Sequence, residues 1–76
     1  MTLRDFVRSE RRAQGMTQRE LAAQAGLHVM TIKFVESRIY GGRFRPGTLG
    51  RVARGIGADI RRLVEIAELN GKLSER

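Results

Sequence analysis

Apolar residues recur at intervals of three and four along most of the chain, which is the spacing of an α-helix that buries one side. Glycines interrupt this pattern and divide it into short segments. The pattern predicts about five helices, over residues 2–15, 17–26, 28–37, 48–56 and 59–70. No segment has the alternating pattern of a strand, so we expect an all-α fold of short helices.

The clearest helix start along the chain is at Thr17. Thr17 and Glu20 have the spacing of a capping box, in which each side chain accepts a hydrogen bond from the backbone N–H of the other residue. Gly26 follows this helix and permits the positive φ of a tight turn. Two helices joined by such a short turn are typical of a helix-turn-helix, whose second helix enters the DNA major groove.

The predicted third helix has apolar residues on two sides. Ile32 and Val35 fall on one stripe and are expected in the core. Met30 and Phe34 project to roughly the opposite side, and Val29 lies beside them. These three large apolar side chains therefore lack an obvious partner within the domain.

Length and composition restrict the protein to one small domain, expected over residues 1–70 with a C-terminal tail over 71–76. Because the chain has no cysteine and a single histidine, we expect no disulfide, no metal and no other cofactor. No apolar run approaches the roughly 18 residues of a membrane span, and residues 1–10 lack the apolar part of a signal peptide. A soluble, cytoplasmic protein without a membrane partner is expected.

Positive charge is concentrated in the second half of the chain. The formal net charge is +7, and residues 38–62 hold seven arginines against one aspartate. Arg38, Arg43 and Arg45 lie beside Tyr40 in the stretch RIYGGRFRPG, whose adjacent glycines and single proline predict a surface loop. This concentration of charge suits the neutralisation of DNA phosphates. Two alternatives stay open, a generally basic solvated surface and a mobile linker.

Three stretches of the chain share their spacing with a known domain. The matching residues are Thr17, Gln18, Leu21, Ala22 and Gly26 of TQRELAAQAGL, then Ile32, Val35 and Glu36, then Pro46, Leu49, Ala53 and Ile56 of PGTLGRVARGIG. In these positions the chain resembles the Xre/Cro-type helix-turn-helix family, over roughly residues 3–64. The resemblance implies a lambda-repressor-like fold of five helices, in which the second and third form the helix-turn-helix.

The resemblance also implies roles for single residues. Gln18 would approach a DNA phosphate and buttress the recognition helix, although the same position suits any exposed helix former. Arg11 would pair with Glu36 as a structural ion pair, while His28 and Thr31 would cap and support the recognition helix. The expected DNA-binding residues are Thr17, Gln18, Arg19, His28, Val29, Met30, Thr31, Lys33, Phe34, Arg38, Tyr40, Arg43 and Arg45.

The sequence departs from the family at the groove-facing positions. Family members commonly use amide or guanidinium groups there, which form bidentate hydrogen bonds with base edges, whereas Val29, Met30 and Phe34 form none. Apolar side chains contact the thymine methyl group, so a site rich in A·T pairs is the expected target, with help from Lys33. Two other interpretations stay open: these residues complete the core, or they form a protein-binding patch.

Catalysis has little support, because the chain has no cysteine nucleophile, its histidine has no acid partner nearby in sequence and its carboxylates are scattered. The expected function is a sequence-specific transcriptional regulator, a repressor that occupies an operator in double-stranded DNA. The alternative is a protein-interaction module of the antitoxin-like or regulator-binding kind. A homodimer is expected, since small readers bind two half-sites. The candidate dimer residues are Ile60, Leu63, Val64, Ile66 and Leu69, or these residues close the monomer core instead.

Overall fold

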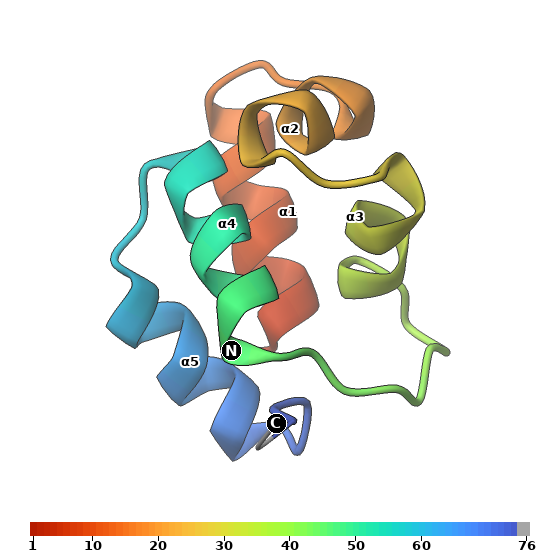
Figure 1. Cartoon of the computed structure of the whole chain (residues 1–76), viewed down its shortest axis with the longest axis vertical. Coiled ribbons are helices and arrows are strands. Elements are labelled where there is room, and N and C mark those ends of the chain that lie inside the picture. Colours follow the sequence, from red (N-terminus) through yellow and green to blue (C-terminus); the bar gives the residue numbers. More distant parts are fainter. Residues whose placement is uncertain (75–76) are drawn as a thin grey trace.

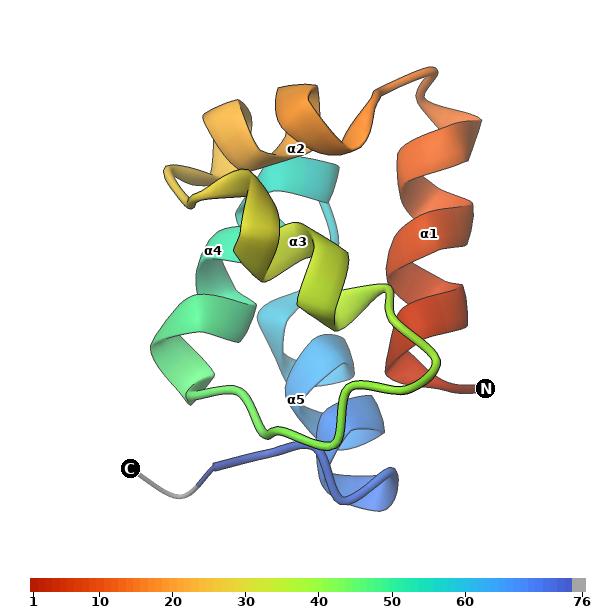
Figure 2. The same ribbon diagram turned by 90° about the vertical axis from the view of Figure 1, so that its right-hand side faces the viewer.

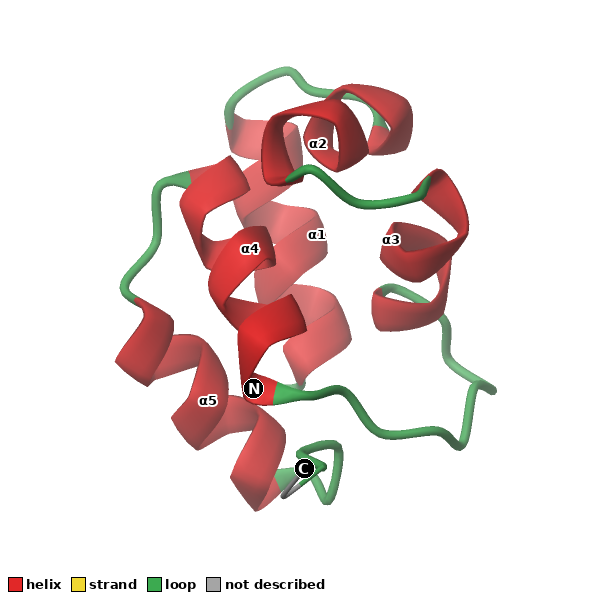
Figure 3. Ribbon diagram, in the orientation of Figure 1, coloured by secondary structure: helices red, strands yellow, loops and turns green. Residues whose placement is uncertain are grey.

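The computed structural model of the chain describes residues 1–74 and contains five helices (Figure 1). They are α1 (Leu3–Ala13), α2 (Gln18–Ala25), α3 (Val29–Val35), α4 (Pro46–Ile56) and α5 (Ile60–Leu69). Over the described residues the only strand-like pairing is an isolated bridge, and Figure 3 shows helices joined by loops. The expected all-α fold of five short helices is confirmed.

Local hydrogen bonds explain where α2 and α3 begin. The Thr17 hydroxyl accepts from the Glu20 N–H at 3.1 Å, and the Glu20 carboxylate accepts from the Thr17 N–H at 3.0 Å. This is the complete capping box expected from the sequence. At the start of α3, Nδ1 of His28 accepts from the N–H of Met30 at 3.1 Å. Both helices are therefore fixed at their N-termini by residues adjacent in sequence.

Three predicted helix boundaries are wrong. α1 ends at Ala13 rather than near Gly15. α4 begins at Pro46 rather than near Thr48, because proline in the first turn lacks only an N–H that has no partner within the helix. α3 ends at Val35 rather than Ser37. The Ser37 hydroxyl accepts hydrogen bonds from the next backbone N–H groups, including that of Tyr40, and so favours a turn over a further helical turn.

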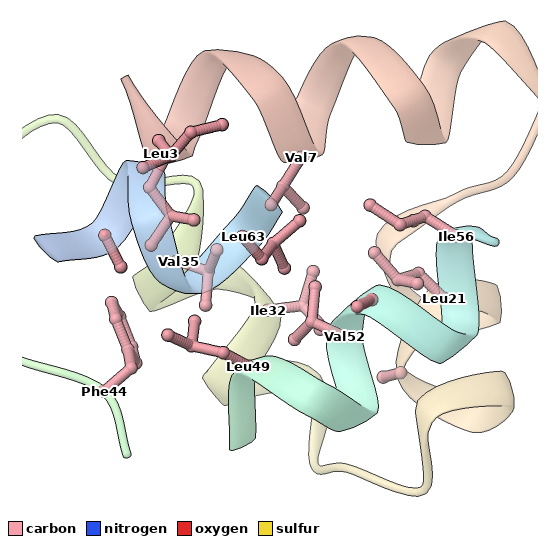
Figure 4. Close-up of a cluster of buried hydrophobic side chains, with 14 of the residues drawn as sticks. Leu3, Val7, Leu21, Ile32, Val35, Phe44, Leu49, Val52, Ile56 and Leu63 are labelled. Atoms are coloured by element: carbon pink, nitrogen blue, oxygen red, sulfur yellow. The ribbon is translucent and has the colours of Figure 1, made fainter. Parts of the chain in front are cut away.

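The core lies between the helices, with α4 packed against α1, α2 and α5. Figure 4 shows buried side chains from all five helices pointing toward one another. The labelled members are Leu3, Val7, Leu21, Ile32, Val35, Phe44, Leu49, Val52, Ile56 and Leu63. Most of them are the inward positions predicted from the three-and-four spacing. Phe44 is the exception, because it comes from the loop.

Two glycines set the position of α2. A Cβ atom at Gly55 of α4 would lie 2.7 Å from Cδ1 of Leu21 and 3.2 Å from Cβ of Ala25, so only glycine allows this close crossing of α2 and α4. Gly26 ends α2 with φ at 69°, in the left-handed region that glycine adopts without steric cost. The turn leading into α3 depends on that conformation.

The loop between α3 and α4 is held by a segment that follows α5. We call residues 37–45 the basic loop and residues 70–74 the strap; Figure 2 shows the strap passing along the basic loop. Phe44 is buried in the core and forms the isolated bridge with Leu73. The expected tail therefore packs on the fold over residues 71–74, while its residues 75 and 76 lie outside the described residues. The mobile-linker interpretation is not supported at Phe44.

Candidate nucleic-acid interface

The orientation of α3 relative to α1 is set by a buried ion pair between Arg11 and Glu36. Nε of Arg11 donates to Oε2 of Glu36 at 2.8 Å and Nη2 donates to Oε1 at 2.8 Å, so the pair that the family resemblance implied forms at two points. The remaining Nη1 donates to the carbonyl of Met16 at 2.8 Å. The hydrogen bonds with Glu36 raise the pKa of Arg11, against the opposing effect of burial, so the guanidinium stays charged.

Gln18 joins the same pair from the start of α2. Its Nε2 donates to Oε1 of Glu36 at 3.3 Å, and the residue is half-buried. Glu36 thus accepts hydrogen bonds from both helices that surround α3. This geometry gives Gln18 the buttressing role; its contact with a DNA phosphate stays a prediction.

The exposed side of α3 carries two large apolar side chains. Met30 is 42% exposed and Phe34 is 39% exposed, whereas Ile32 and Val35 are buried in the core. The interpretation that Met30 and Phe34 complete the core is therefore wrong. Val29 behaves differently: it is half-buried and packs against the core, because it lies on the edge between the two sides of a short helix.

Three aromatic rings run from α3 into the core. The rings of Phe34 and Tyr40 are stacked, with centroids 4.5 Å apart and an interplanar angle of 17°. The rings of Tyr40 and Phe44 follow at 5.6 Å and 37°. Offset and tilted aromatic pairs of this kind are favourable beyond the area that they bury. One side of the Phe34 ring is thus covered by Tyr40 of the basic loop.

The polar members of the expected set are exposed or half-buried. Thr17, Arg19, His28, Lys33, Arg38, Arg43 and Arg45 are exposed, and Thr31 and Tyr40 are half-buried. Figure 2 looks onto α3 with the basic loop beside it, so the arginines of that loop come from a segment next to the recognition helix. The arrangement combines an apolar centre with cations at its margin, which fits a groove lined by phosphates.

One further arginine at this side was not singled out from the sequence. Nη1 of Arg51 on α4 donates to the carbonyl of Gly26 at 3.3 Å. The guanidinium therefore sits at the turn of the helix-turn-helix and satisfies a carbonyl at the end of α2. Its membership of the arginine-rich stretch was visible in the sequence, but its approach to Gly26 depends on the packing of α4 against α2.

The candidate dimer residues on α5 divide into two groups. Leu63 and Ile66 are buried in the core, so the expectation that they face a second copy is wrong and they close the monomer instead. Ile60 is 40% exposed, Leu69 is 78% exposed and Val64 is half-buried. α5 lies on the side of the molecule away from α3 (Figure 1).

No helix over residues 1–74 combines the length and apolar character needed to cross a membrane. Across these residues no group of three or more histidine or carboxylate side chains is placed to hold a metal ion.

The chain matches a known protein family. A family model described as helix-turn-helix matches residues 7–63, which include α2, α3, α4 and the basic loop. No curated protein and no solved structure matches the chain significantly. The match contains the Arg11–Glu36 pair and the exposed side of α3, and it ends before the strap.

Proposed function

The chain belongs to the Xre/Cro-type helix-turn-helix family of DNA-binding transcription regulators, and on this premise we propose that it is a repressor that occupies its operator as a dimer. Its fold is the lambda-repressor-like arrangement of five helices. In such a fold the second helix of the helix-turn-helix enters the major groove. α3 is that helix, and its exposed side is the surface available to base edges.

The observation that carries this proposal is the exposed apolar pair Met30 and Phe34 with arginines beside it. Neither side chain forms hydrogen bonds with a base, but both present the methyl and ring carbons that pack against the thymine C5-methyl group. Lys33, between them in sequence, supplies a cation and hydrogen-bond donors. The operator is therefore expected to be rich in A·T pairs at the positions that α3 covers.

We assign most of the affinity for DNA to the arginines of the basic loop. Arg38, Arg43 and Arg45 are exposed on the basic loop, and phosphate contacts from such residues position a protein without selecting a sequence. Binding through them releases counterions and weakens as salt rises. Base contacts by Met30 and Phe34 would then account for the difference between the operator and other DNA.

Repression and dimerisation extend this picture. A small domain bound across a promoter excludes other proteins from the same DNA, which is repression by occupancy. Two copies on half-sites about one helical turn apart double the contacts. Ile60 and Leu69 are the exposed apolar residues of α5 on which the dimer contact is proposed.

A second candidate function is supported by the same exposed pair. An exposed apolar cluster often marks a protein interface, and methionine adapts well to varied partners. In this alternative, Met30 and Phe34 contact a protein and the arginines serve solubility. The two functions differ in their response to salt, because an apolar protein contact does not weaken steeply as salt rises.

The test is selection of bound duplexes from random-sequence and genomic DNA, followed by titration of the enriched and random duplexes over a salt series. The proposal expects an enriched palindromic A·T-rich site. Met30→Ala and Phe34→Ala should each lower affinity for that site by about tenfold while affinity for random duplexes changes little. Equal, weak binding to all duplexes at every salt concentration would contradict the proposal and favour the protein-interaction module.

A further inference from the structure

We propose that the strap (residues 70–74) positions the basic loop and, through Tyr40, the ring of Phe34 for contact with DNA. The inference rests on the proposed function and adds to it residues that lie beyond the family match, which ends at residue 63. Lys72 and the backbone of Ser74 are the positioning groups. They act on the interface through the basic loop.

The first step of the argument is the backbone pairing between strap and loop. The N–H of Phe44 donates to the carbonyl of Lys72 at 2.7 Å, and the N–H of Ser74 donates to the carbonyl of Phe44 at 2.8 Å. The backbone N–H and the backbone carbonyl of Phe44 are thus both hydrogen-bonded to the strap. Since Phe44 is also buried in the core, the end of the loop next to α4 is held by its side chain and by its backbone.

The second step is a contact of the Lys72 side chain in the middle of the loop. Nζ of Lys72 donates to the carbonyl of Tyr40 in a short hydrogen bond. Tyr40 in turn stacks on Phe34, the most C-terminal of the exposed apolar side chains of α3. Lys72 is therefore connected to the recognition helix through one residue, although the two are far apart in sequence.

The third step is that the strap itself is fixed. Oδ1 of Asn70 accepts from the N–H of Leu3 at 2.7 Å, at the start of α1. The N–H of Lys72 donates to the carbonyl of Ala67 at 2.7 Å, at the end of α5. The strap is thus attached to two helices of the core before it reaches the loop, so it can hold the loop in place.

The loop needs such support because of its own sequence. It contains Gly41 and Gly42 in succession, the residue type with the most conformational freedom. A Cβ atom at Gly42 would lie within 2.4 Å of three atoms of the Tyr40 side chain, so the ring occupies the space that a side chain there would take. A loop ordered before binding avoids the entropy cost of ordering on DNA, which preserves affinity.

Two matched pairs of variants test the inference. Lys72→Met removes the donor to the Tyr40 carbonyl, while Lys72→Arg keeps a donor and the charge. Ser74→Pro removes the N–H that donates to Phe44 without changing any charge, while Ser74→Ala keeps that N–H. The melting temperature of each variant is measured first. Each variant is then titrated with the selected operator and with random duplex at two salt concentrations, at a temperature well below its melting temperature.

A second readout follows the loop without DNA. Tyr40 is the only tyrosine and the chain has no tryptophan, so the tyrosine signal in near-ultraviolet circular dichroism reports the environment of this ring. Lys72→Met and Ser74→Pro should both weaken that signal. Lys72→Met should reduce the ratio of operator to random affinity by about tenfold, the scale of one hydrogen bond to a charged group, and Ser74→Pro should reduce it by about fivefold, the scale of one hydrogen bond between neutral groups. The Lys72→Arg control should stay within about twofold of the wild type, and Ser74→Ala should keep more of the operator-to-random ratio than Ser74→Pro.

Three results would overturn the inference, and they are distinguishable. If Lys72→Met and Ser74→Pro keep the wild-type ratio and tyrosine signal, the strap does not position the loop, while the proposed function stands. If Lys72→Met weakens binding to both duplexes equally and reduces the slope of log affinity against log salt by about one, Lys72 is a phosphate contact. If the wild type itself prefers no duplex, the proposed function fails and the inference fails with it.

Discussion

The guanidinium of Arg11 and the carboxylate of Glu36 face each other in a two-point ion pair, with both N–O distances at 2.8 Å. Arg11 belongs to α1 and Glu36 caps the C-terminal end of α3. Gln18 of α2 donates to the same carboxylate. One buried carboxylate therefore fixes the recognition helix relative to the two helices that precede it.

Breaking this pair from one side should be costly. Arg11→Met leaves the carboxylate of Glu36 buried without its main partner, so we expect the free energy of unfolding to fall by about 3–5 kcal/mol. The double variant Arg11→Met with Glu36→Leu should cost less than Arg11→Met alone, because no charge is left buried. Urea unfolding of the two single variants and the double variant measures this, and simple additivity of the single effects would contradict it.

The glycines of α4 should differ in their response to alanine. Gly55→Ala places a Cβ 2.7 Å from Leu21 and 3.2 Å from Ala25, so we expect a loss of about 1–3 kcal/mol in the free energy of unfolding. Gly47→Ala meets no atom within 4 Å and should stabilise the helix by up to about 1 kcal/mol.

Gly50 provides the intermediate case. Its nearest neighbour is Cδ1 of Ile60 at 2.7 Å, which is the end of a flexible and partly exposed side chain. Gly50→Ala should therefore change the free energy of unfolding by less than about 1 kcal/mol, since Ile60 can turn aside. Thermal melting of the three variants tests the order, and a Gly55→Ala protein as stable as Gly47→Ala would refute the close crossing of α2 and α4.

The arginines of the basic loop should determine how binding depends on salt. Each of Arg38→Gln, Arg43→Gln and Arg45→Gln is expected to reduce the slope of log affinity against log salt by about one, with the same loss on operator and random duplex. Arg61→Gln on α5 serves as the control, because α5 lies away from α3. A slope that responds to Arg61→Gln as strongly as to the loop variants would place the DNA elsewhere.

Acid should weaken the start of α2. The N–H of Thr17 donates to the carboxylate of Glu20, and together with the Thr17 hydroxyl it lowers the pKa of Glu20 below its ordinary value of 4.5. A carboxylate whose pKa is lower in the folded state stabilises the fold above the ordinary pKa and loses that effect as the pH falls through the folded pKa. The wild type should therefore melt at a higher temperature than Glu20→Gln at pH 7.

The comparison with Glu20→Gln should change with pH in one direction. The difference in melting temperature should shrink as the pH is lowered from about 5 toward about 2, where the carboxylate becomes protonated. Thermal melts of both proteins over this range measure it. A difference that stays constant with pH would mean that the charge of Glu20 has no part in the cap.

The sequence by itself determined the helices and most of the core, because these depend on residues close together along the chain. The Thr17–Glu20 capping box and the turn at Gly26 are formed by neighbours. Ile32 and Val35 are buried because the helical period places them on one side. The helix-turn-helix was therefore predictable, whereas the pattern placed Met30 and Phe34 on the other side without excluding that they complete the core; their exposure was decided by the structure.

The tertiary structure decided what surrounds those exposed residues. Whether Leu63 and Ile66 face the core or a second copy depends on where α5 packs, which its own apolar pattern does not fix. The stacking of Tyr40 on Phe34 and the hydrogen bond from Lys72 to the Tyr40 carbonyl join segments separated along the chain. Such contacts leave no periodic signal in the sequence, because they depend on how the core packs the strap against the basic loop.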